Sequence, residues 1–211
     1  MGRPKEQRRR RRELVAAAGR AIVARGMAGL RVRDVAQEAG LSAGLVSYYY
    51  RDLDDLVLEV HQDAVDRFYW TRARAAEEVT DPRERIVRLV AAGLPTDADD
   101  LVCRVLYETH VHAARSRVHA ALMTALWDRE VSLYTAALQH GRDLGVFRLQ
   151  APATDIASNA VALEDAYGLH IVGGNSSIPR EHAHELVLRF LETQTGCSLT
   201  PEDGSATEVS P

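Results

Sequence analysis

The sequence predicts an all-α protein. Apolar residues recur at spacings of three and four along most of the 211 residues, and no alternating or β-branched run is long enough for a strand. Glycine and proline interrupt this pattern at intervals that suit helix ends. With 46% hydrophobic and 27% charged residues, the chain is long enough for one sizeable core, or for a small module joined to a larger one.

The first predicted helix covers residues 6–25. Its apolar positions Leu14, Ala18 and Ile22 share one face, and its front half is a run of arginines. Gly26 is expected to end it in the left-handed geometry that glycine adopts at helix C-termini.

Residues 32–50 predict two short helices that cross at a tight turn. Such a crossing needs a small residue at the contact, a left-handed turn residue and an apolar anchor, and Ala36, Gly40 and Val46 fill these roles. Ser42 stands where its hydroxyl can cap the second helix. This pattern is typical of the helix-turn-helix, whose second helix lies in the major groove of DNA.

The rest of the chain predicts a helical bundle. Helices are expected from near Asp52 to Asp81-Pro82, from there to the break at Leu94-Pro95-Thr96, and then over residues 98–115, 117–142, 154–172 and 179–195. The helix at 117–142 is apolar on two faces, which favours the middle of a bundle. The last two helices each carry a broad apolar face, as helices that pair with a second copy of the chain commonly do.

Charge is divided unevenly along the chain. Residues 1–51 carry 12 basic against 4 acidic side chains, whereas the remainder carries 14 against 26, which gives the net charge of −4. A basic head on an acidic body is expected of a phosphate-binding module joined to a domain that does not bind nucleic acid.

The composition also bears on the compartment. Cys103 and Cys197 are too few and too differently placed for a disulfide framework, which fits a reducing cytoplasm. The N-terminal arginines followed by apolar residues resemble the start of an export signal, but Arg20 and Arg25 interrupt the apolar stretch. No run of 18 apolar residues occurs, so we predict a cytoplasmic protein with no membrane partner.

A family resemblance rests on the turn and the helix that follows it. Ala-Gly-Leu-Ser at 39–42 and Ala-Gly-Leu-Val-Ser-Tyr-Tyr-Tyr at 43–50 follow the order found in the TetR family of one-component bacterial regulators. Ser47 ahead of the tyrosines is similar to the BetI-like branch, as are the turn at 145–147 and the segment 163–169.

The resemblance implies a DNA-binding transcriptional regulator without enzymatic activity or a cofactor. It implies a dimeric repressor that pairs through its last two helices, binds a palindromic operator on double-stranded DNA and is released by a small-molecule effector. The corresponding domains are a basic arm (1–12), a helix-turn-helix domain (13–51), a helical ligand-binding and dimerisation domain (52–195) and a disordered tail (196–211).

The resemblance also implies the DNA-contacting residues. Phosphate contacts are assigned to hydroxyls and base-proximal positions to small residues, namely Ser42, Tyr48 and Tyr49 in the first group and Ala43, Gly44 and Ser47 in the second. The family's usual threonine is replaced here by Leu30-Arg31, so Arg31 or Arg33 is expected to contact phosphate instead, while Leu53 stands where many members place a lysine. Arg3 in the arm is expected to reach a minor groove, or else only to attract phosphates generally.

Polar groups embedded in apolar helices are the predicted ligand contacts. They are Tyr107, His110, Trp127, Glu130, Tyr134, Asn159, Glu164 and Tyr167. Carboxylates beside aromatic rings would suit an amine or quaternary cation. In the alternative interpretation Glu108 and Glu130 are solvated, and Glu164, Asp165 and His170 make polar contacts across a dimer.

Other functions are weaker alternatives. The pairs His110/His112 and His182/His184 are spaced i,i+2, which points them to different sides of a helix, so no metal site is predicted. An architectural DNA-binding protein without an effector stays open. A helical-bundle enzyme is a remote alternative, because it would leave the basic head unexplained.

Overall fold

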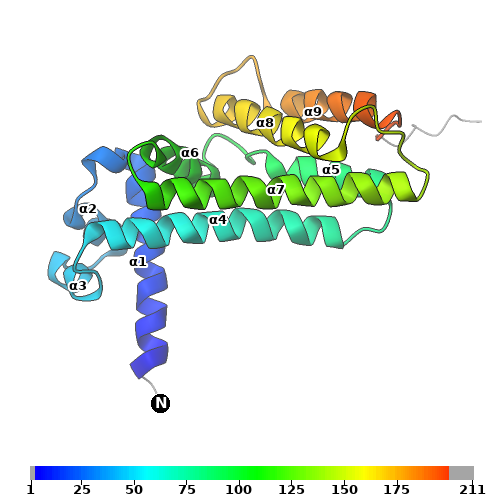
Figure 1. Ribbon diagram of the computed structural model, residues 1–211. Helices are drawn as coiled ribbons and strands as arrows, with labels where there is room; N and C mark the ends of the chain where they lie inside the picture. The colour runs from blue at the N-terminus through cyan, green and yellow to red at the C-terminus, as the bar shows by residue number, and fades with distance from the viewer. Residues whose placement is uncertain (1–2, 200–211) are drawn as a thin grey trace, which may run out of the picture. The chain divides into compact units, whose positions relative to one another are not determined.

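The computed structural model describes residues 3–199, with side chains from residue 5 onward. This part of the chain is helical throughout and contains no strand, which confirms the all-α prediction (Figure 1). The elements are α1 (Arg3–Arg25), the 3-10 turn η1 (Met27–Gly29), α2 (Val32–Ala39), α3 (Ala43–Tyr49), α4 (Leu53–Glu77), α5 (Pro82–Gly93), α6 (Leu101–Ala113), α7 (Arg117–Asp143), α8 (Ala153–Val172) and α9 (Arg180–Thr195). None of these helices is long and apolar enough to cross a membrane.

The chain divides into two compact units. The first unit contains residues up to Tyr69 together with Asp97–Trp127, and the second contains Trp70–Thr96 and the chain from Asp128 onward. The division falls within α4 and within α7, so each of these long helices contributes to both units.

The first unit is built on α1. Leu14 and Ile22 of α1 are fully buried in one core with Val46 of α3 and with Val105 of α6. Helix α1 packs against α2 and α6, and α6 also contacts η1. The expected boundary at residue 51 therefore does not coincide with the division between units, because apolar side chains of α6 complete the core of the N-terminal helices.

Several helix ends differ from their predicted positions. Helix α1 begins at Arg3 rather than near residue 6, so the described part of the predicted arm is helical. Gly26 has the expected positive φ of 73°, but its ψ of 158° is extended, so it turns the chain away rather than closing a left-handed cap. Helix α6 begins at Leu101 rather than at residue 98, because the Asp100 carboxylate accepts hydrogen bonds from the backbone N–H groups of Val102 and Cys103.

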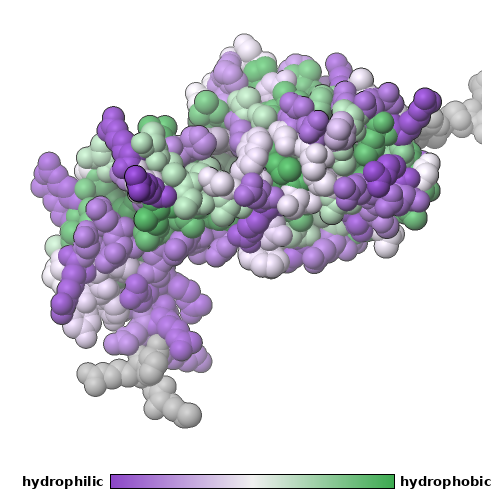
Figure 2. Space-filling view, in the orientation of Figure 1, coloured by the Kyte–Doolittle hydropathy of each residue, from purple (hydrophilic) through white to green (hydrophobic). Residues whose placement is uncertain are grey.

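The N-terminal part of α1 is strongly polar. Figure 2 shows hydrophilic residues gathered over this end of the helix, which Figure 1 draws in dark blue. Side chains from Lys5 to Arg9 are exposed, and Leu14 is the first that is fully buried. The polar stretch therefore extends the helix beyond the apolar core.

The second unit has its own core on α5, α7, α8 and α9. Ile86, Leu138, Ile156 and Leu191 are buried in it. Helix α9 packs against α8 and α5, and the Arg180 guanidinium at its start donates hydrogen bonds to the carbonyls of Ala91 in α5 and of Pro95 just after it.

Residues 196–199, which the prediction assigned to a disordered tail, pack against the second unit. Gly196 closes α9 in the left-handed conformation with φ 61° and ψ 29°. Leu199 is buried, and its backbone N–H donates to the Glu192 carboxylate at 2.9 Å. The remainder of the predicted tail, 200–211, lies outside the described residues. The burial of Leu199 and this hydrogen bond thus hold the first residues after the helix on the core.

A pair of histidines is buried inside the first unit. His61 of α4 and His119 of α7 stack with their rings 8° from parallel, and their Nδ1 atoms lie 2.7 Å apart. His112 of α6 meets His119 edge-on, and the other ring nitrogen of His61 lies 3.3 Å from the sulfur of Met123. Burial and the neighbouring His119 lower the pKa of His61 to about 4, and burial lowers the pKa of His119 as well.

This pair predicts a loss of stability in acid. A histidine whose pKa is depressed by folding contributes stability that is complete above its unfolded pKa near 6.5 and is lost as the pH falls through about 4. The unfolding free energy is therefore expected to fall by on the order of 2 kcal/mol over this range through His61 alone. Thermal unfolding followed by circular dichroism at several pH values measures it.

The matched comparison uses leucine substitutions. The H61L/H119L double variant removes both imidazoles and is expected to flatten the decline between pH 6.5 and pH 4. His140→Leu removes an exposed histidine of α7 and should keep the wild-type slope. If the double variant declined as steeply as His140→Leu, the pair would not be responsible.

Candidate functional site

Helix α2 begins at a carboxylate cap that the sequence interpretation missed. Asp34 is buried, and its carboxylate accepts a hydrogen bond from the backbone N–H of Arg31 at 3.0 Å. The same carboxylate lies 3.4 Å from the guanidinium of Arg25 at the end of α1. Asp34, the third residue of α2, thus satisfies the backbone N–H of the N-cap residue Arg31, as the acidic residue of a capping box does. An acidic residue three positions after the N-cap was the available signal.

The turn between α2 and α3 has the predicted geometry. Gly40 adopts φ 65° and ψ 34°, the left-handed region, and Leu41 donates its N–H to the Ala36 carbonyl. Ser42 caps α3 by accepting a hydrogen bond from the Leu45 N–H at 3.2 Å. Val46 anchors α3 with 1% of its surface exposed.

The predicted DNA-contacting residues of α3 face solvent together. The residues that are exposed at the cap and along the outer face are Ser42, Ala43, Gly44, Ser47 and Tyr48. Tyr48 is 71% exposed, whereas Tyr49 is half-buried and meets the Tyr48 ring edge-on at 5.3 Å. Small residues beside exposed hydroxyls let a helix approach a groove closely while hydrogen-bonding to phosphate.

Two of the three arginines predicted to contact DNA have described side chains. Arg31 and Arg33 are both exposed at the start of α2, where Arg33 also lies 3.9 Å from the Asp34 carboxylate. Arg3 is the first residue of α1, and its side chain lies outside the described part of the chain.

The second unit contains a buried ion network. Arg72 of α4 donates hydrogen bonds to Glu130 of α7 and, at 2.7 Å, to Glu164 of α8. The hydroxyl of Tyr134 donates to the other oxygen of Glu164 at 2.5 Å, and the guanidinium of Arg72 lies 5.5 Å from the centre of the Tyr134 ring. All four side chains are less than 6% exposed.

The structure brings together three predicted ligand contacts and corrects their environment. Glu130 is buried, so it is not solvated as the alternative interpretation expected. Glu164 is buried and is engaged within its own chain by Arg72 and Tyr134. The two carboxylates share Arg72 as a counter-charge.

Arg72 is the residue that sequence reasoning missed. It continues the i+4 series of α4 through Leu56, Val60, Ala64 and Phe68, so the same helix face that is apolar in its first half carries an arginine in its second. A charge on an otherwise apolar stripe was the signal for a buried partner.

Burial dominates the electrostatics of the network. It raises the pKa of Glu130 to about 8 and that of Glu164 to about 7, against the opposing pull of Arg72. Two carboxylates on one guanidinium carry one excess negative charge when all are ionised, and a low-dielectric interior disfavours that charge. Burial and the excess negative charge thus both favour protonation of these carboxylates.

Helix α5 leaves room for the Glu164 carboxylate. A Cβ at Gly93 would lie 2.5 Å from Glu164 Oε2, closer than such atoms approach. The glycine is required here by this close approach, since any side chain would displace the carboxylate from Arg72.

The other predicted ligand residues do not join this cluster. In the second unit Asn159 is exposed and donates to the Asp155 carbonyl of its own helix, and Tyr167 is half-buried. Tyr107, His110 and Trp127 belong to the first unit, where Tyr107 is half-buried and the other two are exposed. Among the described residues no group of three histidine, cysteine or acidic side chains is arranged to hold a metal ion.

Two known protein families match different parts of the chain. Residues 14–60 match the family described as bacterial regulatory proteins, tetR family, and residues 82–196 match BetI-type transcriptional repressor, C-terminal. The chain belongs to the TetR family. It is therefore a DNA-binding transcriptional regulator of a non-enzymatic family, with a BetI-type C-terminal domain.

Individual relatives agree with this assignment. The regulator BetI of Brucella melitensis is 27% identical over 80% of this chain and 94% of its own length. The regulator PksA of Bacillus subtilis is 22% identical over 89% and 91%, respectively. BetI of Burkholderia cenocepacia is 42% identical, but over only 39% of this chain and 43% of its own length.

Solved structures share the fold. A putative transcriptional regulator from Saccharomonospora viridis, crystallised in complex with choline, has a TM-score of 0.80 and 26% identity, over 87% of this chain and 96% of that one. A TetR regulator from Haloarcula marismortui has a TM-score of 0.78 at 22% identity, over 90% and 98%.

Removing Arg72 is expected to destabilise the protein in a pH-dependent way. Arg72→Met leaves two buried carboxylates without their counter-charge, which typically costs about 3–5 kcal/mol. Lower pH relieves the cost because protonation neutralises the carboxylates. Chemical denaturation should therefore show a larger loss at pH 8.5 than at pH 6.

An exposed ion pair provides the control. Arg88→Met removes the same charge from a pair with Glu84 in which both side chains are about half exposed. Its effect is expected to stay within about 1 kcal/mol at both pH values. An Arg72→Met loss as small as this, or one independent of pH, would contradict the electrostatic account.

Proposed function

We propose that this regulator is an effector-responsive repressor that binds a palindromic operator as a homodimer. The observation that carries the proposal is the exposed face of α3, which begins at the Ser42 cap and presents Ser47 and Tyr48, in a chain of the TetR family. Two copies of such a helix, spaced by one turn of DNA, read a two-fold symmetric site.

Apolar surface on α8 and α9 supports pairing through these helices. Leu169 of α8 is 57% exposed, and Leu163 and Tyr167 on the same helix are half-buried. On α9 the predicted apolar face is partly buried within the chain, since Val187 is buried while Phe190 remains half-buried.

Sedimentation of wild type and Leu169→Glu tests this surface, because a charge at a dimer contact should yield monomers.

The proposed effector is a cation of the amine or quaternary ammonium class. A relative was crystallised with choline, and the interior of the second unit holds two carboxylates against one guanidinium beside an aromatic ring. A small cation would compensate the excess negative charge of this network and find an aromatic face.

Titration calorimetry tests the effector class. We expect choline or spermidine to bind and benzoate not to bind. We also expect the bound cation to weaken operator binding, because it favours one distance between the two DNA-binding units of the dimer. Binding of anionic or neutral compounds alone would overturn the proposed class.

Footprinting separates a repressor from an architectural protein, because the latter would protect many sites about equally.

Arg33 is expected to act as a phosphate contact. Arg33→Gln should weaken binding to operator and to random duplex alike, and should reduce the salt slope of log affinity by about 0.9. Arg88→Gln, an exposed arginine of α5, is the control and should leave the slope unchanged. Fluorescence anisotropy over a range of salt concentrations measures both, and equal slopes for the two variants would remove Arg33 from the interface.

A further inference from the structure

The C-terminal end of α3 is held by a polar contact that does not involve the exposed residues of this helix. Tyr50 is the C-cap of this helix, where its backbone N–H donates to the Val46 carbonyl at 2.9 Å. Its side chain is only 4% exposed, and its hydroxyl donates to Oε2 of Glu59 on α4 at 2.7 Å. Burial, and then Glu59, raise the pKa of Tyr50, so the hydroxyl remains a donor.

The same carboxylate oxygen binds a third helix. The guanidinium of Arg11 on α1 donates to Oε2 of Glu59 at 2.7 Å, and its carbon lies 4.6 Å from the centre of the Tyr50 ring. Arg11 is thus engaged by a charge-assisted hydrogen bond and by an aromatic face at once. We call Arg11, Tyr50 and Glu59 the α3 clamp.

Helix α3 depends on such contacts because it is short. It has seven residues, and isolated helices of that length are not stable in water. Its position is therefore set by tertiary contacts, which include the apolar anchor Val46 near its middle and the clamp at its end. A shift at the end of a helix this short is carried to Ser47 and Tyr48 on its exposed face.

We propose that Glu59 is a positioning residue for operator binding, which fixes α3 against α1 and α4 through Tyr50 and Arg11. The clamp sets the angle at which α3 enters the groove, and Arg11 acts within the protein rather than on phosphate. Base readout needs this angle, whereas general phosphate attraction does not. Loss of the clamp therefore lowers the preference for operator over random duplex.

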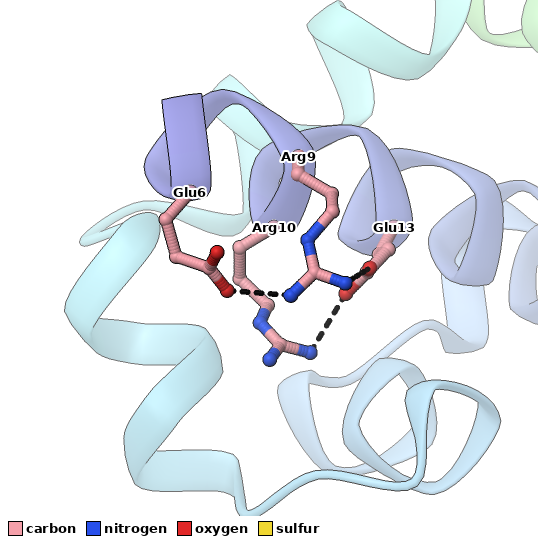
Figure 3. Close-up of polar contacts among 4 residues, drawn as sticks. All are labelled: Glu6, Arg9, Arg10 and Glu13. Atoms are coloured by element: carbon pink, nitrogen blue, oxygen red, sulfur yellow. Dashed lines mark hydrogen bonds and ion pairs between the residues drawn. The ribbon is translucent and has the colours of Figure 1, made fainter. Parts of the chain in front are cut away.

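The chain offers a matched control for the charge. Glu13 of α1 pairs with Arg10 at 2.7 Å and with Arg9 at 3.6 Å, and Figure 3 shows these pairs lying along α1. Its side chain is 40% exposed, close to the 35% of Glu59. Glu59→Gln and Glu13→Gln each remove one negative charge from the first unit, so both increase phosphate attraction, but only the former changes a contact to α3.

The experiment compares affinities of the full-length variants for two duplexes without any effector. One duplex is the operator that wild type selects from a random pool, and the other is a random sequence of equal length. For Glu59→Gln we expect the ratio of the two affinities to fall about tenfold, the size of effect that losing one charged hydrogen bond produces. For Glu13→Gln the ratio should stay at the wild-type value. A wild-type ratio for Glu59→Gln would overturn the proposal.

Two further variants separate positioning from direct DNA contact. Tyr50→Phe removes only the hydroxyl and keeps the buried ring, so it should fold as wild type by circular dichroism and still lower the ratio. Arg11→Gln should lower the ratio without changing the salt slope of operator binding. A decrease of the slope by about 0.9 would make Arg11 a phosphate contact and overturn its assigned role. Should Glu59→Gln unfold, Tyr50→Phe alone decides, and an unchanged ratio there would overturn the clamp.

Discussion

The close crossing of α2 and α3 is the constraint on which the DNA-binding surface depends. Ala36 and Val46 are almost fully buried at this crossing, and Gly40 supplies the left-handed turn between the helices. With the inner face fixed in this way, the residues at the start and on the outside of α3 are left exposed as a group. The remaining contacts of the first unit keep this surface in place, since Asp34 caps α2, Ser42 caps α3, and Tyr50 and Glu59 hold the far end.

The second unit combines a large apolar core with a buried ion network. An apolar core can pack without such a network. Burying Arg72 with two carboxylates carries a desolvation cost that mutual attraction offsets only with good geometry and full hydrogen bonding. The Tyr134 hydroxyl and the space that Gly93 leaves for Glu164 both contribute to that geometry. It joins α4, α7 and α8, so the relative positions of these helices are specified by polar geometry as well as by side-chain volume.

Local chemistry made much of the fold predictable. Helical periodicity, the proline and glycine breaks and the Ser42 and Gly40 signals depend on near neighbours in the chain, and the structure agrees with them. The partners of Glu130 and Glu164 were not predictable in this way, because Arg72 lies 58 and 92 residues distant in sequence. Likewise, Tyr50 belongs to the expected tyrosine run, but its contact with Arg11 and Glu59 depends on the packing of three helices. Periodicity shows that a residue is buried and leaves its tertiary partner undetermined.

The charge balance of the network bears on why a regulator would contain it. An apolar cluster of similar volume is often as stable or more stable than a buried ion network, so stability alone does not account for three ionisable groups at this place. One guanidinium against two carboxylates leaves an excess negative charge, and burial raises the pKa values of Glu130 and Glu164, which favours compensation of this charge by a proton. A small cationic molecule carries positive charge as a proton does, so the two would compete to compensate the same excess negative charge. This competition would couple the helices joined by Arg72 to the cation concentration, which is the physical requirement for a sensor of that ligand class.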